Sequence, residues 1–114
     1  MMVDAFMPAI AGSVTISVGA VSSTTTIPSG TRSTTFPAKA GGEMLELNNT
    51  SASVDVFVEV CNAAQIVAAT VAASYPVRAG QCKIIKRAPG DDRITAIGAA
   101  AGPTNLIVSV GNGI

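Results

Sequence analysis

The stretch Val54-Asp55-Val56-Phe57-Val58-Glu59-Val60 decides the fold, because apolar and polar residues alternate along it with a period of two. In a β-strand, this pattern places the four valines on one face and Asp55, Phe57 and Glu59 on the other. The valine face is predicted to meet a core, while the second face stays at least partly wet. The rest of the chain is then expected to supply the sheets that cover these valines.

The segments on either side of this stretch extend the β pattern. Residues 43–49 alternate with Leu45 and Leu47 on the inward parity, and Asn48-Asn49-Thr50-Ser51 is typical of a turn. This predicts an antiparallel hairpin between residues 43–49 and 54–61. On the other side, the alanine-rich residues 63–73 favour a strand near residues 66–71, with a short helix as the alternative.

Further short strands are expected between Gly-, Pro- and Asn-rich turns, over residues 13–18, 32–36, 81–87, 93–98 and 105–110. The polar residues 22–30 are expected to form an edge strand or an extended loop. About eight short strands at this spacing are typical of an all-β protein, an antiparallel β-sandwich or jelly roll. Residues 13–114 are therefore predicted to form one β-sandwich domain.

The first twelve residues fit neither a helix nor a clean strand, because Pro8 and Gly12 interrupt their apolar residues. They are predicted to form an extended N-terminal arm, either loosely packed or ordered against a partner. The interface candidates in this arm are Met1, Met2, Phe6, Met7 and Ile10. The segment lacks the basic start of a secretion signal, and no apolar run elsewhere is long enough to span a bilayer.

Composition limits the classes of partner. The chain has 114 residues and no net charge, with 48% hydrophobic, 4% aromatic and 12% charged residues. One core built from Val, Ile, Leu and Ala is expected. A neutral surface argues against a general nucleic-acid binder.

The charges are unevenly placed along the chain. Up to residue 60 there are five acidic and two basic residues, and after it five basic and two acidic ones. This predicts either complementary charges on neighbouring strands or oppositely charged faces that dock onto copies or a scaffold. The basic cluster comprises Lys83, Lys86, Arg87 and Arg93, on two strands expected to be hairpin neighbours. It is interpreted as a solvated sheet face or a docking patch for acidic residues.

The residues needed for catalysis are poorly represented. The chain has no histidine and no Gly-x-Ser-x-Gly motif. Asp91 and Asp92 follow Pro-Gly, as turn residues do. Cys61 and Cys82 are expected to be reduced thiols, and one such pair without histidine does not make a usual zinc site. The sequence therefore predicts no enzyme, no cofactor, no metal and no small-molecule substrate.

Residues 43–114 contain a series of short strand and turn segments: Leu-Asn-Asn, Val-Phe-Val-Glu-Val, Tyr-Pro-Val-Arg-Ala-Gly-Gln, Ile-Thr-Ala-Ile-Gly, Ala-Ala-Gly and Ile-Val-Ser-Val-Gly-Asn-Gly-Ile. Together these segments resemble small virion proteins of tailed bacteriophages, notably capsid decoration or cement proteins. The resemblance implies a β-sandwich that is made in the host cytoplasm and binds the outside of the capsid. There it would bridge neighbouring major capsid proteins, commonly as a dimer or trimer.

Alternatives remain open at this point. Another virion part, such as a head fibre base or a tail component, could have the same sandwich. A carbohydrate-binding module is a further alternative, although Tyr75 and three Phe residues are few for stacking on sugars. If the chain acts on a lattice, the outward face of residues 54–60 is expected to be contacted by basic strands or a neighbour, with Phe57 as an interface candidate.

Overall fold

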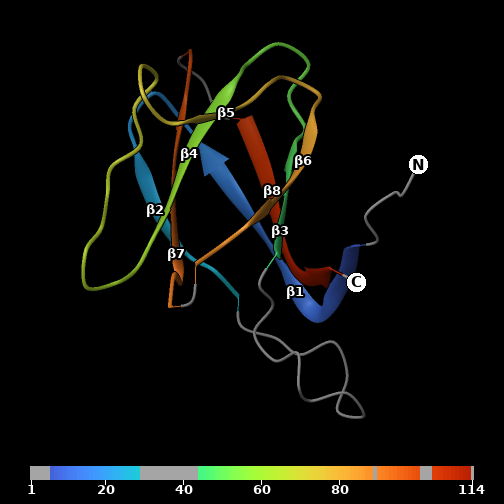
Figure 1. Ribbon diagram of the computed structural model, residues 1–114. Helices are drawn as coiled ribbons and strands as arrows, with labels where there is room; N and C mark the ends of the chain where they lie inside the picture. The colour runs from blue at the N-terminus through green and yellow to red at the C-terminus, as the bar shows by residue number, and fades with distance from the viewer. Residues whose placement is uncertain (1–5, 29–43, 89, 101–103, 114) are drawn as a thin grey trace.

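The computed structural model describes residues 6–28, 44–88, 90–100 and 104–113. Over these residues the chain forms eight strands in two four-stranded antiparallel sheets and no helix (Figure 1). The predicted fold class is confirmed: the protein is all-β, with the arrangement of a β-sandwich.

The two sheets have four strands each. Sheet A contains, in spatial order, β1 (Phe6–Val18), β8 (Thr104–Gly113), β3 (Met44–Asn49) and β6 (Cys82–Lys86). Sheet B contains β2 (Ser23–Thr26), β7 (Arg93–Gly98), β4 (Val56–Cys61) and β5 (Tyr75–Val77). In Figure 1, β2, β7 and β4 lie on one side of the molecule, and β8, β3 and β6 on the other.

The first half of the chain pairs with the second half in reverse order. Strand β1 pairs with β8, β2 with β7, β3 with β6, and β4 with β5. Two further pairings, β3 with β8 and β4 with β7, join these pairs into the two sheets. As a result, successive strands alternate between the sheets except at β4 and β5, which are neighbours in sheet B.

The predicted hairpin between residues 43–49 and 54–61 is wrong. Strand β3 lies in sheet A and β4 in sheet B, so the residues between them cross from one sheet to the other. The physical reason is that turn chemistry serves a crossing loop as well as a hairpin. Asn49 is buried, and its side-chain amide donates to the carbonyl oxygens of Val54 at 2.8 Å and Val77 at 3.0 Å.

The core lies between the sheets, where the valine face of β4 meets sheet A. Val56 and Val58 are buried in it, and Val60 packs against it from a partly buried position. The remaining members are aliphatic side chains from both sheets and from residue 27 after β2: Ile16, Val18, Ile27, Leu45, Leu47, Val77, Ile94, Ala96, Leu106, Val108 and Val110. The predicted inward parity of the valines in the strand is therefore confirmed.

The extended N-terminal arm over residues 1–12 is not confirmed. Residues 1–5 lie outside the described residues, and from Phe6 onward the chain belongs to β1. Phe6, Met7 and Pro8 pair with β8, and the register shifts before pairing resumes at Ser13. Pro8 lies in an edge strand, the place in a sheet where proline is tolerated because only one side of the strand is paired.

Two other predicted segments have different outcomes. The edge strand expected within residues 22–30 is present as β2. Residues 66–71, by contrast, form neither a strand nor a helix. The strand expected over residues 32–36 lies outside the described residues.

Candidate functional site

The loop between β4 and β5 covers the outer face of sheet B. We call residues 62–74 the covering loop; in Figure 1 it runs in yellow-green along the far side of β2 and β7 from sheet A. It contains no charged residue, and nearly all of its side chains are exposed. Ala69 is the exception within its middle part, buried at 3% exposure. The loop therefore presents an uncharged surface to solvent.

Polar side chains of sheet B, and of Ser22 just before β2, bond to the covering loop. The Thr95 hydroxyl, which is buried, donates to the carbonyl oxygen of Val67 at 2.6 Å. The Ala69 N–H donates to Ser22 Oγ at 3.0 Å, and Ser74 Oγ donates to a carboxylate oxygen of Glu59 at 2.8 Å. The outward polar residues of the strands thus bond to the loop instead of water, which explains how it stays in place without regular secondary structure.

Turns at both ends of the covering loop close it locally. At the start, the Asn62 side-chain oxygen accepts from the N–H groups of Ala64 and Gln65, each at 3.0 Å. At the end, Thr70 N–H donates to Ser74 Oγ at 2.9 Å, and Ser74 N–H donates back to the Thr70 carbonyl at 3.1 Å. Such side-chain turns compete with helix formation. This is the reason that the alanine-rich sequence does not become a helix.

Three aliphatic side chains of the covering loop are unusually exposed. Ile66, Val67 and Val71 have exposed fractions of 47%, 45% and 47%. Single exposed aliphatic residues are common, but three of them on one anchored, uncharged loop make this loop a candidate binding surface. The lack of charge is visible in the sequence, but the pattern there predicts a strand and therefore does not indicate this surface.

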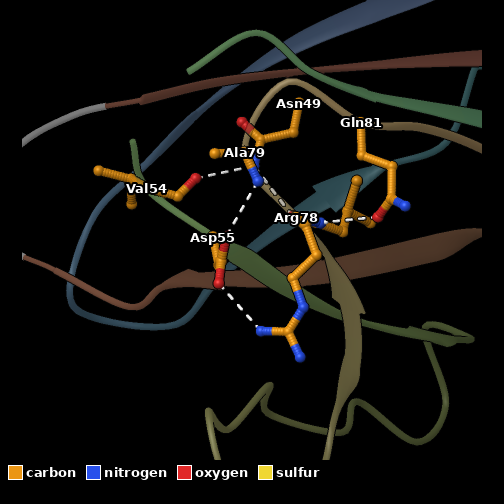
Figure 2. A network of polar contacts seen from close by, with 7 residues as sticks. Asn49, Val54, Asp55, Arg78, Ala79 and Gln81 are labelled. Atoms are coloured by element: carbon orange, nitrogen blue, oxygen red, sulfur yellow. Dashed lines mark hydrogen bonds and ion pairs between the residues drawn. The ribbon is translucent and has the colours of Figure 1, made fainter. Parts of the chain in front are cut away.

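A second polar network lies at the end of the sandwich where β3 crosses to β4 (Figure 2). The two carboxylate oxygens of Asp55 accept from the N–H of Ala79 and from the guanidinium of Arg78, both at 2.9 Å. The Arg78 N–H in turn donates to the side chain of Gln81 at 3.1 Å. The network ties the β3–β4 crossing to the loop between β5 and β6. It also pairs an acidic residue of the first half with a basic residue of the second, as one of the charge predictions anticipated.

These bonds lower the pKa of the Asp55 carboxyl below its ordinary value of 3.8. The first cause is the hydrogen bond from the Ala79 backbone, and the second is the bond from Arg78, whereas partial burial acts in the opposite direction. Both bonds are stronger when the acceptor is the ionised carboxylate. The end of the sandwich is therefore held most firmly when Asp55 is charged.

Acidification is expected to destabilise the protein through Asp55. A carboxyl whose pKa is lower in the folded chain than in the unfolded chain contributes stability above its unfolded value, and loses it as the pH falls through the folded value. The loss from Asp55 is thus expected below about pH 4. Urea unfolding at pH 7 and pH 3 checks this: Asp55→Asn should be less stable than wild type at pH 7, and the difference should shrink at pH 3. Asp91→Asn serves as the control, and a constant difference for Asp55→Asn would contradict the assignment.

The expectation that the basic residues lie on hairpin neighbours is wrong, because β6 and β7 belong to different sheets. Lys83 and Lys86 sit at opposite parities of β6, and the Lys83 ammonium lies over the Tyr75 ring, 4.9 Å from its centroid. Arg87 donates to the backbone oxygen of Asp91 at 3.0 Å, and Arg93 pairs with Asp92 at 3.0 Å. These residues therefore do not form one basic docking patch on a single sheet.

The other interface candidates have mixed positions. Phe57 is on the outward parity of β4 as predicted, but only 8% of it is exposed, and the Arg78 guanidinium lies 6.0 Å from its ring centroid. Phe6, Met7 and Ile10 are in β1, and Met1 and Met2 lie outside the described residues. A partner contact by any of these residues stays a prediction.

The two cysteines and the aspartate pair lie in positions that involve no shared site. Cys61 and Cys82 are both free, Cys61 buried and Cys82 exposed. The pKa of the Cys82 thiol is nevertheless raised, first because neighbouring atoms remove part of its water and then because Glu46 lies nearby. Asp91 and Asp92 follow the turn at Gly90, whose φ of 89° favours glycine, and Asp92 accepts from the N–H of Ala63 at 3.1 Å. Within the described residues, no cluster of three or more His, Cys, Asp or Glu side chains is placed to bind a metal ion.

Comparison with known proteins adds no relative: no protein-family model, no curated protein and no solved structure matches this chain. None of the described residues belongs to a helix that is long and apolar enough to cross a membrane.

Proposed function

We propose that this protein is a structural component of a tailed-phage virion. It binds the outside of the capsid and cements neighbouring major capsid proteins. The observation that carries the proposal is the covering loop, an uncharged and anchored surface from which Ile66, Val67 and Val71 project. A preformed apolar surface of this kind suits a protein whose task is lasting contact with another protein.

The strand order supports this proposal. Strand β1 pairs with β8, β2 with β7, β3 with β6 and β4 with β5. The chain is thus folded back on itself once, and the resulting pairs of antiparallel strands surround the core. We infer from this order that the sandwich is a jelly roll, an architecture found in viral capsid and lectin domains. The resemblance of residues 43–114 to decoration proteins, which came from short sequence segments alone, points in the same direction.

The size of the surface is compatible with a repeated contact. A single loop buries far less area than a stable interface of about 1,600 Å² needs, so one loop on one neighbour binds weakly. On a closed shell, self-associated copies make the same contact many times, and linked contacts raise the total affinity. A cement protein needs this kind of added strength rather than one tight site.

The alternatives differ in how well they fit. Another virion component, such as a head fibre base or a tail protein, would use the same surface, and localisation on the particle by electron microscopy separates the two. A carbohydrate-binding module is less well supported. Its best stacking residue, Tyr75, is 42% exposed but already has the Lys83 ammonium over its ring.

The test is binding to purified empty capsids of the phage that encodes the chain. Wild-type protein is expected to bind them and to raise the temperature at which they disrupt. The double variant Ile66→Asp/Val71→Asp should bind at least about tenfold more weakly, because it places charges where apolar contact is needed. Val21→Asp is the matched control, since Val21 is 80% exposed but lies outside the covering loop.

A second variant in the same capsid-binding experiment loosens the covering loop without changing its exposed side chains. Thr95→Val removes the hydroxyl that bonds to Val67, and should weaken capsid binding less than the double variant does. Thr24→Val is its control, because Thr24 pairs directly with Thr95 but is exposed. Failure of the wild-type protein to bind capsids, or equal binding by the double variant, would overturn the proposal.

A further inference from the structure

The sandwich has four edge strands, and they are not equally protected. Sheet A ends at β1 and β6, and sheet B ends at β2 and β5. An edge strand presents unpaired backbone N–H and C=O groups, which can pair with another chain. Proteins commonly block this with charged side chains, with proline or by keeping the edge strand very short.

Three of the four edges carry such a device. Strand β6 has Lys83 and Lys86 among its five residues. Strand β5 has only three residues, and Pro76 is one of them. Strand β2 has four residues and is soon followed by Pro28. None of these edges offers a long run of backbone for a second strand.

The edge at β1 carries none of these devices over residues 13–18. It belongs to a strand of 13 residues, and the sequence from Ala5 to Thr31 contains no charged residue. The only proline of β1, Pro8, lies on the far side of the register shift. Among the described residues, β8 is the only strand that pairs with β1, so the opposite edge of residues 13–18 has no described partner strand.

The side chains along this edge fit a second strand. Ser13, Thr15 and Ser17 are exposed on the outer face of sheet A, where small hydroxyl residues can bond across a strand pair. On the inner face, Ile16 and Val18 are buried, but Val14 is only partly buried against the core. A further strand beside β1 would cover the exposed part of Val14.

We propose that this edge pairs in antiparallel fashion with the same edge of a second copy of this chain, with Thr15 opposite Thr15 and Ser13 opposite Ser17. The pairing would join two copies of sheet A into one eight-stranded sheet around a two-fold axis. Antiparallel pairing of identical strands places like residues close to one another, and like charges there would oppose it. The absence of any charge from residue 5 to residue 31 therefore favours a second copy as the occupant.

This inference is independent of the proposed function. The covering loop lies on sheet B, so pairing at the β1 edge of sheet A leaves it open. A dimer formed in this way would present two covering loops at once, which is the arrangement in which linked weak contacts gain strength. Loss of dimerisation and loss of capsid binding can be measured separately.

Analytical ultracentrifugation of the full chain over a concentration series tests the pairing. Wild-type protein is expected to show a monomer–dimer equilibrium, and Thr15→Lys should raise its dissociation constant about tenfold, because two lysines would face each other across the new pair. Ser13→Lys is a second variant at the same edge. Thr24→Lys is the matched control on β2, and it should leave the equilibrium unchanged. Urea unfolding establishes that each variant is folded.

Mixing two variants gives the sharpest result. Thr15→Lys and Thr15→Glu should each dimerise weakly alone, but an equimolar mixture should dimerise at least as tightly as wild type, since opposite charges then meet across the pair. A monomeric wild-type protein over the whole series would overturn the proposal. So would equal weakening by Thr24→Lys, or a mixture no tighter than its components.

Discussion

Replacing Asn49 by alanine is expected to lower the free energy of unfolding by about 2–4 kcal/mol. Its side chain has no solvent exposure and makes three bonds: two donated to the carbonyl oxygens of Val54 and Val77, and one accepted from the N–H of Ser51 at 3.0 Å. Alanine would leave these backbone groups without their partner at a buried site. Each such group costs far more than the net value of an ordinary hydrogen bond.

Equilibrium unfolding in urea measures this effect, and the neighbouring residue supplies the control. Asn48 has the same chemistry but sits on the outer face of sheet A in a partly exposed position, so Asn48→Ala should change stability by less than about 1 kcal/mol. Asn49→Asp separates the donors from the acceptor, because aspartate keeps the bond from Ser51 and loses both donated bonds. Equal effects of Asn48→Ala and Asn49→Ala would show that the buried network does not stabilise the crossing.

A loss of about 2–5 kcal/mol is expected when Leu47 is replaced by alanine. Leu47 is fully buried in β3, a strand held between β8 and β6 in the middle of sheet A. Its cross-strand neighbours are Val108 on one side and the long side chain of Lys83 on the other. With no Trp in the chain and few other aromatic residues, the core has few large side chains to move into the space.

The same urea experiment measures the Leu47→Ala effect, with Val21→Ala as its control. Val21 is 80% exposed and loses little apolar contact on truncation, so its change should stay within about 0.5 kcal/mol. A Leu47→Ala loss as small as that of Val21→Ala would mean that sheet A repacks freely around β3, which would contradict the buried position of this side chain.

The alternation of residues 54–60 was enough to predict an all-β fold and the side of β4 that faces the core. It was not enough to predict which strands pair. A period of two is the same whether the next strand returns beside its neighbour or crosses to the facing sheet, and Asn-rich turns suit both cases. The crossing after β3 depends on Asn49 reaching Val77, a residue 28 positions away, and no local pattern contains that contact.

The covering loop could not be predicted from the sequence for a related reason. Residues 63–73 have no charge and no clear period, so their own sequence does not specify a structure. Two of their backbone groups bond to the side chains of Thr95 and Ser22, and Glu59 accepts from the Ser74 hydroxyl at the end of the loop, so the partners come from three different parts of the chain. The same contacts explain why the outward face of β4 and β7 carries polar residues although the covering loop shields much of it from water.

The reversed pairing of the strands also limits when each strand can find its partner during synthesis. The Ser13 hydroxyl lies 2.7 Å from that of Ser109, so this contact joins residues 96 positions apart. Within the described part of the chain, β1 has no other strand to pair with, and it must wait for β8 to leave the ribosome before it gains a partner. Contacts of such long range slow folding into the range of about milliseconds to seconds. Until then the uncharged first strand stays unpaired, and this is the interval in which the nascent chain is most prone to aggregation.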